Sequence, residues 1–327
     1  MFKQKKRAYT KNTFVQKRAV KMTNNIFVKN EYEIHFSNNY IIVKDIRNKH
    51  YLRLTGKPMK FIEKNINSDK LASFLHTVFS SRTYSAKNEL ICIEYTNSQK
   101  FKNVITMMPS IFFRLSFMIS IITLGIISGL VSMFFEKEHA TQPFHVYLCW
   151  TLLNIIVHEM GHIILCIKSG RSVYSFGLKL NYFIPMAYID TSDICMSDLK
   201  YKVATSLGGI YLNAILCIIA TVTYLINDCP IFSYLATISL FFVFSNLVPF
   251  FKLDGYYVVS DLFEETSLNR ASKSAIKKLL LRENKLSNHD FVLILFYILK
   301  NIFFIAVLGS IFYECFLFIA SHNLFKC

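Results

Sequence analysis

The sequence after Pro109 consists largely of apolar runs long enough to cross a lipid bilayer, and this constrains the fold more than any other feature. The first run, residues 111–135 (IFFRLSFMISIITLGIISGLVSMFF), exceeds the roughly 20 helical residues that a bilayer core requires. Four similar runs follow, at residues 144–168, 203–226, 231–251 and 291–320. We therefore expect a multi-span α-helical membrane protein with about five transmembrane helices.

The last apolar run is interrupted by Lys300 and Glu314. Charged side chains are costly inside a bilayer. One span from about residue 301 to 320, preceded by a helical segment at the membrane interface, fits this pattern best. Six spans, with the last run divided into two short ones, remain the alternative.

The positive charge lies almost entirely in the first third of the chain. Residues 1–108 hold 21 Lys and Arg against 7 Asp and Glu, whereas residues 109–327 hold 16 against 14. Strong basicity is typical of proteins that bind nucleic acid or an anionic membrane surface. We do not expect a nucleic acid partner, because the basic residues are spread along the segment. A membrane-tethered DNA-binding regulator is the alternative that this charge leaves open.

The region before the apolar runs predicts a small cytosolic domain. After a basic N-terminal tail, residues 1–25, the segments IFVKNEYEIHF, YIIVKDI and ELICIEY alternate apolar and polar residues as strands do. MKFIEKNI and DKLASFLHTVF between them have helical spacing. Residues 26–108 are thus expected to form an α+β domain, winged-helix-like in its order of elements, and residues 109–327 the membrane domain. An irregular α+β cap is the alternative.

The distribution of Lys and Arg in the loops predicts the orientation in the membrane. Loop 136–142 is slightly acidic and NDCP at 227–230 has no Lys or Arg, so both suit the outer side. Segments 168–202 and 252–290 are rich in Lys and Arg, which suits the cytosol. The N-terminus is then cytosolic and the C-terminus lies outside.

The second apolar run contains the sequence His158-Glu159-Met160-Gly161-His162. Residues four apart share one face of a helix, so both imidazoles can bind one zinc ion. Glu159 stands beside the pair and can take a proton from the attacking water, as in metalloproteases. The alternative is that these polar groups only form hydrogen bonds to neighbouring helices.

A third ligand is required, because catalytic zinc sites usually have three protein ligands and one open position. The fourth apolar run ends in SNLVPFFKLDGYY, in which Asp254 is placed to reach the metal as a carboxylate ligand. Pro249 should interrupt or end this helix and free backbone groups near Asn246. Irregular backbone at such a depth is tolerated where it lines a cavity.

HEMGH in one span and N-x-x-P-x-x-x-x-D-G at the end of a later one together resemble the site-2 protease family of membrane-embedded zinc metallopeptidases. The resemblance implies that His158, His162 and Asp254 bind Zn²⁺ and that Glu159 is the general base. It also implies that Asn246 and Pro249 form the substrate-binding segment, with Asn246 holding the substrate backbone extended. The run LGGIYLN, residues 207–213, is similar to the span of the family in which small residues precede an asparagine, although Ile210 stands where many members have proline.

Residues 176–193 (FGLKLNYFIPMAYIDTSD) are too polar to span a membrane but alternate enough for a β-hairpin. The resemblance implies a re-entrant strand near the active site, to whose edge a substrate adds. A cytosolic loop with no substrate role is the alternative. No segment is long enough for the PDZ insertion of some members, which argues against the stress-signalling type of site-2 protease.

The sequence motif KLDGYY and the compact N-terminal domain are most similar to those of the peptide zinc metalloprotease subgroup of this family. That subgroup is linked to maturation or export of ribosomally made peptides, including bacteriocin-like ones. This implies a zinc metalloendopeptidase in a bacterial cytoplasmic membrane, with a peptide precursor as substrate, the lipid bilayer as surroundings and a peptide exporter as a partner. One alternative is regulated intramembrane proteolysis of a single-span membrane protein. Another is a peptide transport or immunity protein that does not cleave.

Overall fold

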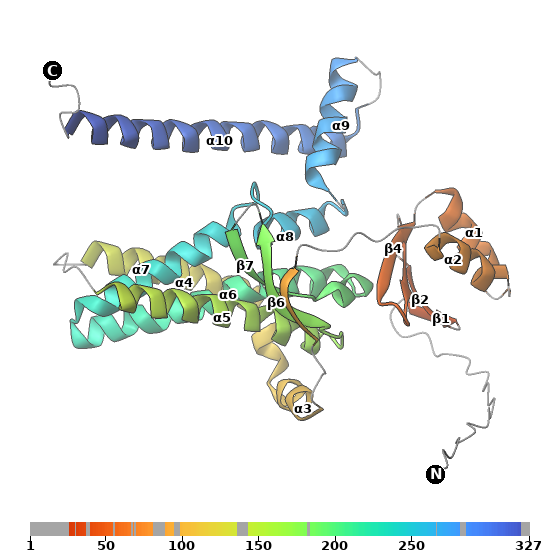
Figure 1. Cartoon of the computed structure of the whole chain (residues 1–327), viewed down its shortest axis with the longest axis horizontal. Helices are drawn as coiled ribbons and strands as arrows, with labels where there is room; N and C mark the ends of the chain where they lie inside the picture. Colours follow the sequence, from red (N-terminus) through yellow and green to blue (C-terminus); the bar gives the residue numbers. More distant parts are fainter. Residues whose placement is uncertain are drawn as a thin grey trace, which may run out of the picture. The chain divides into compact units, whose positions relative to one another are not determined.

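The computed structural model describes residues 26–29, 31–36, 40–54, 56–66, 68, 70–80, 89–94, 99–135, 143–181, 184–265, 267–281 and 286–321. The chain forms two compact units, Met1–Ser85 and Ala86–Cys327 (Figure 1). The basic tail expected at residues 1–25 and the loop 136–142 lie outside the described residues.

The first unit is a four-stranded antiparallel sheet followed by two helices. Its strands are β1 (Ile26–Lys29), β2 (Tyr32–Phe36), β3 (Ile41–Asp45) and β4 (His50–Leu54), which pair in that order. The helices are α1 (Lys57–Asn65) and α2 (Lys70–Ser80).

Alternation along the strands places one row of apolar side chains on the face that forms the core. Ile34 pairs with Val43, and Val43 pairs with Leu52, so three strands contribute to the same row. Ile62 of α1 and Leu75 of α2 complete this core, and both are almost fully buried. Burial of these aliphatic groups is the main stabilisation available to so small a unit.

The order of elements in this unit differs from the winged-helix-like expectation. The segment expected as one strand at residues 26–36 is a hairpin, β1 and β2, and β4 at His50–Leu54 was not expected. The expected third strand, β5 (Glu89–Glu94), pairs with β6 (Ser175–Asn181) of the second unit. The second unit therefore begins before the boundary that the sequence predicts at residue 108, since strand alternation indicates a strand but not its partner.

The second unit is mostly helical and confirms the number of long apolar helices. Among the described residues, five helices are long and apolar enough to cross a membrane, which is typical of a membrane protein. They are α4 (Leu115–Phe135), α5 (Phe144–Lys168), α6 (Leu199–Asn227), α7 (Pro230–Leu247) and, up to Glu314, α10 (Asn288–Ser321).

The last apolar run forms one continuous helix rather than two short ones, and whether its first part lies at the membrane interface stays a prediction. α10 runs unbroken through Lys300, whose Nζ donates a hydrogen bond to Asn269 Oδ1 at 2.7 Å. Asn269 belongs to α9 (Leu268–Leu280), which packs against α10. This partner explains how a lysine can lie within an otherwise apolar helix.

Helix α6 occupies the centre of the helical bundle and packs against α4, α5 and α7 (Figure 1). Small residues allow the helices to approach closely. A Cβ atom at Gly125 of α4 would lie 2.7 Å from the Cβ of Ala214 in α6. Close backbone approach at Gly125 thus adds to the packing of large side chains in the bundle, where Ile210 and Tyr211 of α6 are buried in one cluster with Met118 of α4.

The second unit also contains shorter elements that precede or connect the long helices. These are α3 (Gln99–Met107), the 3₁₀ helices Ser110–Phe113 and Ser192–Met196, β7 (Ile184–Ile189) and α8 (Asp254–Leu262). The expected hairpin is present as β6 and β7, and β5 joins it to form a three-stranded antiparallel sheet. Whether this hairpin re-enters the membrane stays a prediction.

Candidate metal centre

Both histidines of the HExxH sequence lie on α5, one turn apart and on the same face. The Nε2 atoms of His158 and His162 are 3.3 Å from each other. His158 is only 8% exposed. The four-residue spacing thus brings two imidazole nitrogens to one point, as the sequence predicts for a metal-binding pair.

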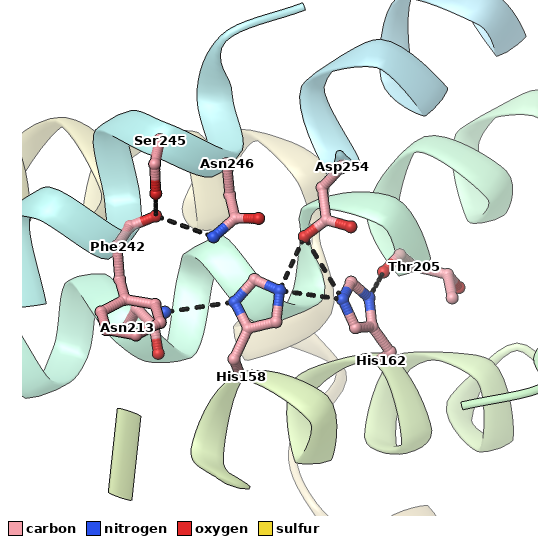
Figure 2. A network of polar contacts seen from close by, with 8 residues as sticks. All are labelled: His158, His162, Thr205, Asn213, Phe242, Ser245, Asn246 and Asp254. Carbon is pink, nitrogen blue, oxygen red and sulfur yellow. Dashed lines mark hydrogen bonds and ion pairs between the residues drawn. The ribbon is translucent and has the colours of Figure 1, made fainter. Parts of the chain in front are cut away.

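Asp254 reaches the same point from a separate helix (Figure 2). α7 ends at Leu247, two residues before Pro249, and the chain turns back so that Asp254 becomes the first residue of α8. Asp254 Oδ2 lies 2.9 Å from His158 Nε2 and 3.3 Å from His162 Nε2.

The turn that delivers Asp254 depends on the glycine that follows it. A Cβ atom at Gly255 would lie 2.3 Å from the backbone oxygen of Leu247 and 2.9 Å from that of Asn246. The start of α8 can therefore lie directly against the end of α7 only because position 255 has no side chain.

The geometry of the three ligand atoms fits a tetrahedral metal ion. Two atoms that bind the same zinc at about 2.0–2.1 Å lie about 3.3 Å apart, which is close to the separations found here. His158, His162 and Asp254 together form a group that could hold a metal, with all ligand atoms within 4.8 Å of one another. Asp254 Oδ2 is buried and accepts no well-formed hydrogen bond among the described residues, so its lone pairs are available to bind a cation.

The charge state of Asp254 suits this role. Burial would raise the pKa of its carboxyl group, but the neighbouring His162 and His158 outweigh burial and hold the pKa below its usual range. The side chain is therefore a carboxylate at neutral pH, which is the form that binds metals.

Helix α6 contacts the other nitrogen of each imidazole. The backbone oxygen of Thr205 lies 2.8 Å from His162 Nδ1, and Asn213 Nδ2 lies 3.1 Å from His158 Nδ1. The two helices can approach this closely because Gly161 faces Gly208: a Cβ atom at Gly161 would lie 2.2 Å from the backbone oxygen of Gly208.

Sequence reasoning did not identify the contacts that Thr205 and Asn213 make with the histidines. Asn154, one turn before His158 on α5, is also buried, but its Nδ2 donates to Trp150 O of its own helix at 3.0 Å. The sequence held two signals for Asn213: the resemblance of LGGIYLN to a span in which small residues precede an asparagine, and an amide within an apolar run, since such groups face the interior of a helix bundle.

The remaining expected site residues lie outside this three-residue group. Glu159 is partly buried on α5, interacts electrostatically with His162 and is not part of the three-residue group. Asn246 lies in the last turn of α7, where its Nδ2 donates to Phe242 O at 2.9 Å (Figure 2). Pro249 lies in the turn between α7 and α8.

Chemically, the arrangement offers two imidazole nitrogens and one carboxylate from two different helices, with a further carboxylate next to one histidine. This donor set suits a divalent transition metal of the zinc type. Three protein ligands leave a fourth tetrahedral position for a water molecule or a substrate oxygen.

Comparison with known proteins gives one informative match. A stretch of 138 residues, 40% of this chain, is 29% identical to the Bacillus subtilis (strain 168) protein named "Putative peptide zinc metalloprotease protein YydH", of which it covers 52%. The match thus spans about half the length of that relative. No protein-family model matches the chain. No solved structure matches it either.

Proposed function

We propose that this chain is a membrane-embedded zinc metalloprotease of the site-2 protease type. The observation that carries the proposal is the convergence of His158, His162 and Asp254 from two helices at separations that suit one zinc ion. The name of the B. subtilis relative, a peptide zinc metalloprotease, supports the same conclusion.

The residues have separate roles in this mechanism. His158, His162 and Asp254 would hold zinc, which when bound supplies a Lewis acid for a water molecule and a scissile carbonyl. Glu159, adjacent to the first ligand, would accept a proton from the attacking water and return it to the departing amine. The four residues together favour catalysis over binding alone, because metal binding does not need Glu159.

The proposed substrate is a ribosomally made peptide precursor, bound in extended form. β7 pairs with β6 on one side and has no strand partner on its other side among the described residues. The same strand packs against α5, which bears the two histidines. A substrate strand could therefore add to β7 and reach the metal, with Asn246 and Pro249 contacting its backbone.

The location that we propose is the cytoplasmic membrane of a bacterium, with the N-terminal unit in the cytosol and cleavage near the cytosolic face. The first unit would bind the leader of the precursor, and a peptide exporter would remove the product. Cleavage of a single-span membrane protein at the same centre is the alternative substrate class, because both histidines lie on α5, which is long enough to span a bilayer.

The experiment is a cleavage assay with purified protein in lipid nanodiscs. Short precursor peptides encoded near the gene, and a single-span membrane segment, are incubated with the wild type and with Glu159→Gln. Mass spectrometry should show a product of one peptide-bond hydrolysis with the wild type and none with Glu159→Gln. Equal cleavage by both proteins would refute the mechanism, and no cleavage by a zinc-loaded wild type would favour the transport or immunity alternative.

A further inference from the structure

The partner of His158 Nδ1 differs in kind from the partner of His162 Nδ1. His162 faces the backbone oxygen of Thr205 at 2.8 Å, whereas His158 faces the side-chain amide of Asn213 at 3.1 Å (Figure 2). A backbone oxygen can only accept a hydrogen bond. An asparagine amide can donate through Nδ2 or accept through Oδ1.

The carbonyl of Thr205 fixes the tautomer of His162. Because that oxygen can only accept, His162 must carry a proton on Nδ1, so Nε2, which faces the centre, is the nitrogen left to bind a metal. A neutral imidazole with this arrangement is ready to bind a metal. No rearrangement of its partner is needed.

His158 has two arrangements that its surroundings can satisfy. With the proton on Nε2, the imidazole faces Asp254 Oδ2 at 2.9 Å and can accept from Asn213 Nδ2 through Nδ1. With a metal on Nε2, the proton must move to Nδ1, and the amide must then present Oδ1. Which end of an asparagine faces a neighbour is set by such networks.

The imidazole of His158 cannot rotate so that its Nδ1 faces a partner other than Asn213. Asn213 is completely buried, and Gly209, one turn earlier on α6, lies so close to the imidazole that a Cβ atom there would be 2.5 Å from Cε1 and Nε2 of His158. His158 is thus held between α6 and Asp254. Asn213 Oδ1 is buried and has no hydrogen-bond partner among the described residues, so no hydrogen bond at that end holds the amide in its present orientation.

We propose that Asn213 is a positioning residue that reverses its amide when His158 takes a metal, so that His158 Nδ1 has a partner in both tautomers. The proposal rests on the metal centre of the proposed function but goes beyond it, since it concerns a residue that contacts neither metal nor substrate. Asparagine suits this role because aspartate could only accept and leucine could do neither.

Two substitutions test the proposal, with zinc affinity measured by chelator competition on detergent-purified full-length protein. Asn213→Leu keeps the approximate volume but removes both hydrogen-bonding ends, and should lower zinc affinity about 10- to 100-fold. Asn213→Asp keeps an acceptor for His158 Nδ1–H and should bind zinc at least as tightly as the wild type. The matched control is Asn154→Leu, a second buried asparagine, whose Nδ2 binds only its own helix among the described residues and whose loss should leave zinc affinity unchanged.

A spectroscopic measurement separates positioning from simple packing. With ¹⁵N-labelled histidine, zinc should move the proton of His158 to Nδ1 in the wild type. The Asn213→Asp protein should hold the proton there before zinc is added. A change in packing alone would not produce this difference.

The outcomes distinguish this inference from the proposed function. A folded Asn213→Leu protein with wild-type zinc affinity would overturn the inference and leave the metalloprotease proposal intact. If Asn213→Leu does not fold, loss of zinc by Asn213→Asp overturns it instead. If zinc binding depends on Asn213 but the wild type cleaves no peptide, the inference is supported and protease activity is refuted. If the wild type binds no zinc, both the inference and the proposed function are refuted.

Discussion

Gly209 of α6 lies directly against the imidazole ring of His158. A Cβ atom at position 209 would lie 2.5 Å from Nε2 and 2.6 Å from Nδ1 of that ring. Contacts this short between a Cβ atom and a buried ring cannot be accommodated without movement. The position of one candidate metal ligand is therefore set by the absence of a side chain on a different helix.

We expect Gly209→Ala to displace His158 or to separate α5 from α6, and so to reduce zinc affinity by about 10-fold or more, similar to other disturbances next to metal ligands. The measurement is zinc content after dialysis against a weak chelator. Gly309→Ala is the control, because a Cβ atom at Gly309 of α10 meets nothing within 4 Å. Retention of full zinc content by Gly209→Ala would contradict the close contact.

Asp254→Asn should strongly reduce the zinc content of the purified protein, from about one ion per chain. The substitution keeps the shape of the side chain but removes the carboxylate that both histidines face. Metal analysis of the purified protein measures the effect. Glu314→Gln, which removes an exposed carboxylate in α10, should change nothing. Undiminished zinc in Asp254→Asn would mean that the third ligand is another residue.

Much of this architecture could be predicted from local patterns. The long apolar runs predict the five helices, and the four-residue spacing of His158 and His162 predicts that their rings share a face. Pro249 predicts that α7 ends nearby, and it ends at Leu247. Each of these properties depends on a short stretch of sequence and on a helix or strand period.

The relations between distant segments could not be predicted in the same way. The pairing of β5 with β6 joins residues far apart in the chain, and strand alternation carries no information about the partner. The contact between Asn213 and His158 depends on how far α6 is rotated about its axis. That rotation is fixed by the approach of Gly161 to Gly208, which is visible only in three dimensions.

Glu159→Gln should retain zinc but lower peptide cleavage about 10²- to 10⁴-fold, which is the usual contribution of a general base. The amide keeps the size of the side chain but cannot accept the proton of the attacking water. Zinc content and the initial rate of product formation are measured on the same preparation. Met160→Leu is the neighbouring control, since Met160 is 42% exposed on the outer face of α5 and should leave both quantities unchanged. Loss of zinc from Glu159→Gln would instead make Glu159 a structural part of the metal centre.

Lys168, the last residue of α5, forms hydrogen bonds to the end of α3 and so links the helix that bears the two histidines to α3. Its Nζ donates to the backbone oxygens of Met108 at 2.7 Å, Thr106 at 3.1 Å and Ile105 at 3.4 Å. The last carbonyls of a helix have no partner within the helix, and a cation near that end interacts favourably with the helix dipole. The ammonium group therefore satisfies several acceptors at the end of α3 at once.

Lys168→Met should remove these hydrogen bonds while keeping most of the length of the side chain. A hydrogen bond to a charged group contributes about 1.5–3 kcal/mol, so the end of α3 should open more readily by an amount of this order. Hydrogen exchange of the backbone amides should accelerate in Gln99–Met107, whereas zinc content should stay at the wild-type level. Lys200→Met, which removes an exposed lysine over the ring of Tyr201, is the control and should leave exchange in α3 unchanged. If exchange in α3 is the same in both variants, Lys168 does not hold these two helices together; if zinc is also lost in Lys168→Met, the contact instead helps to position the histidines.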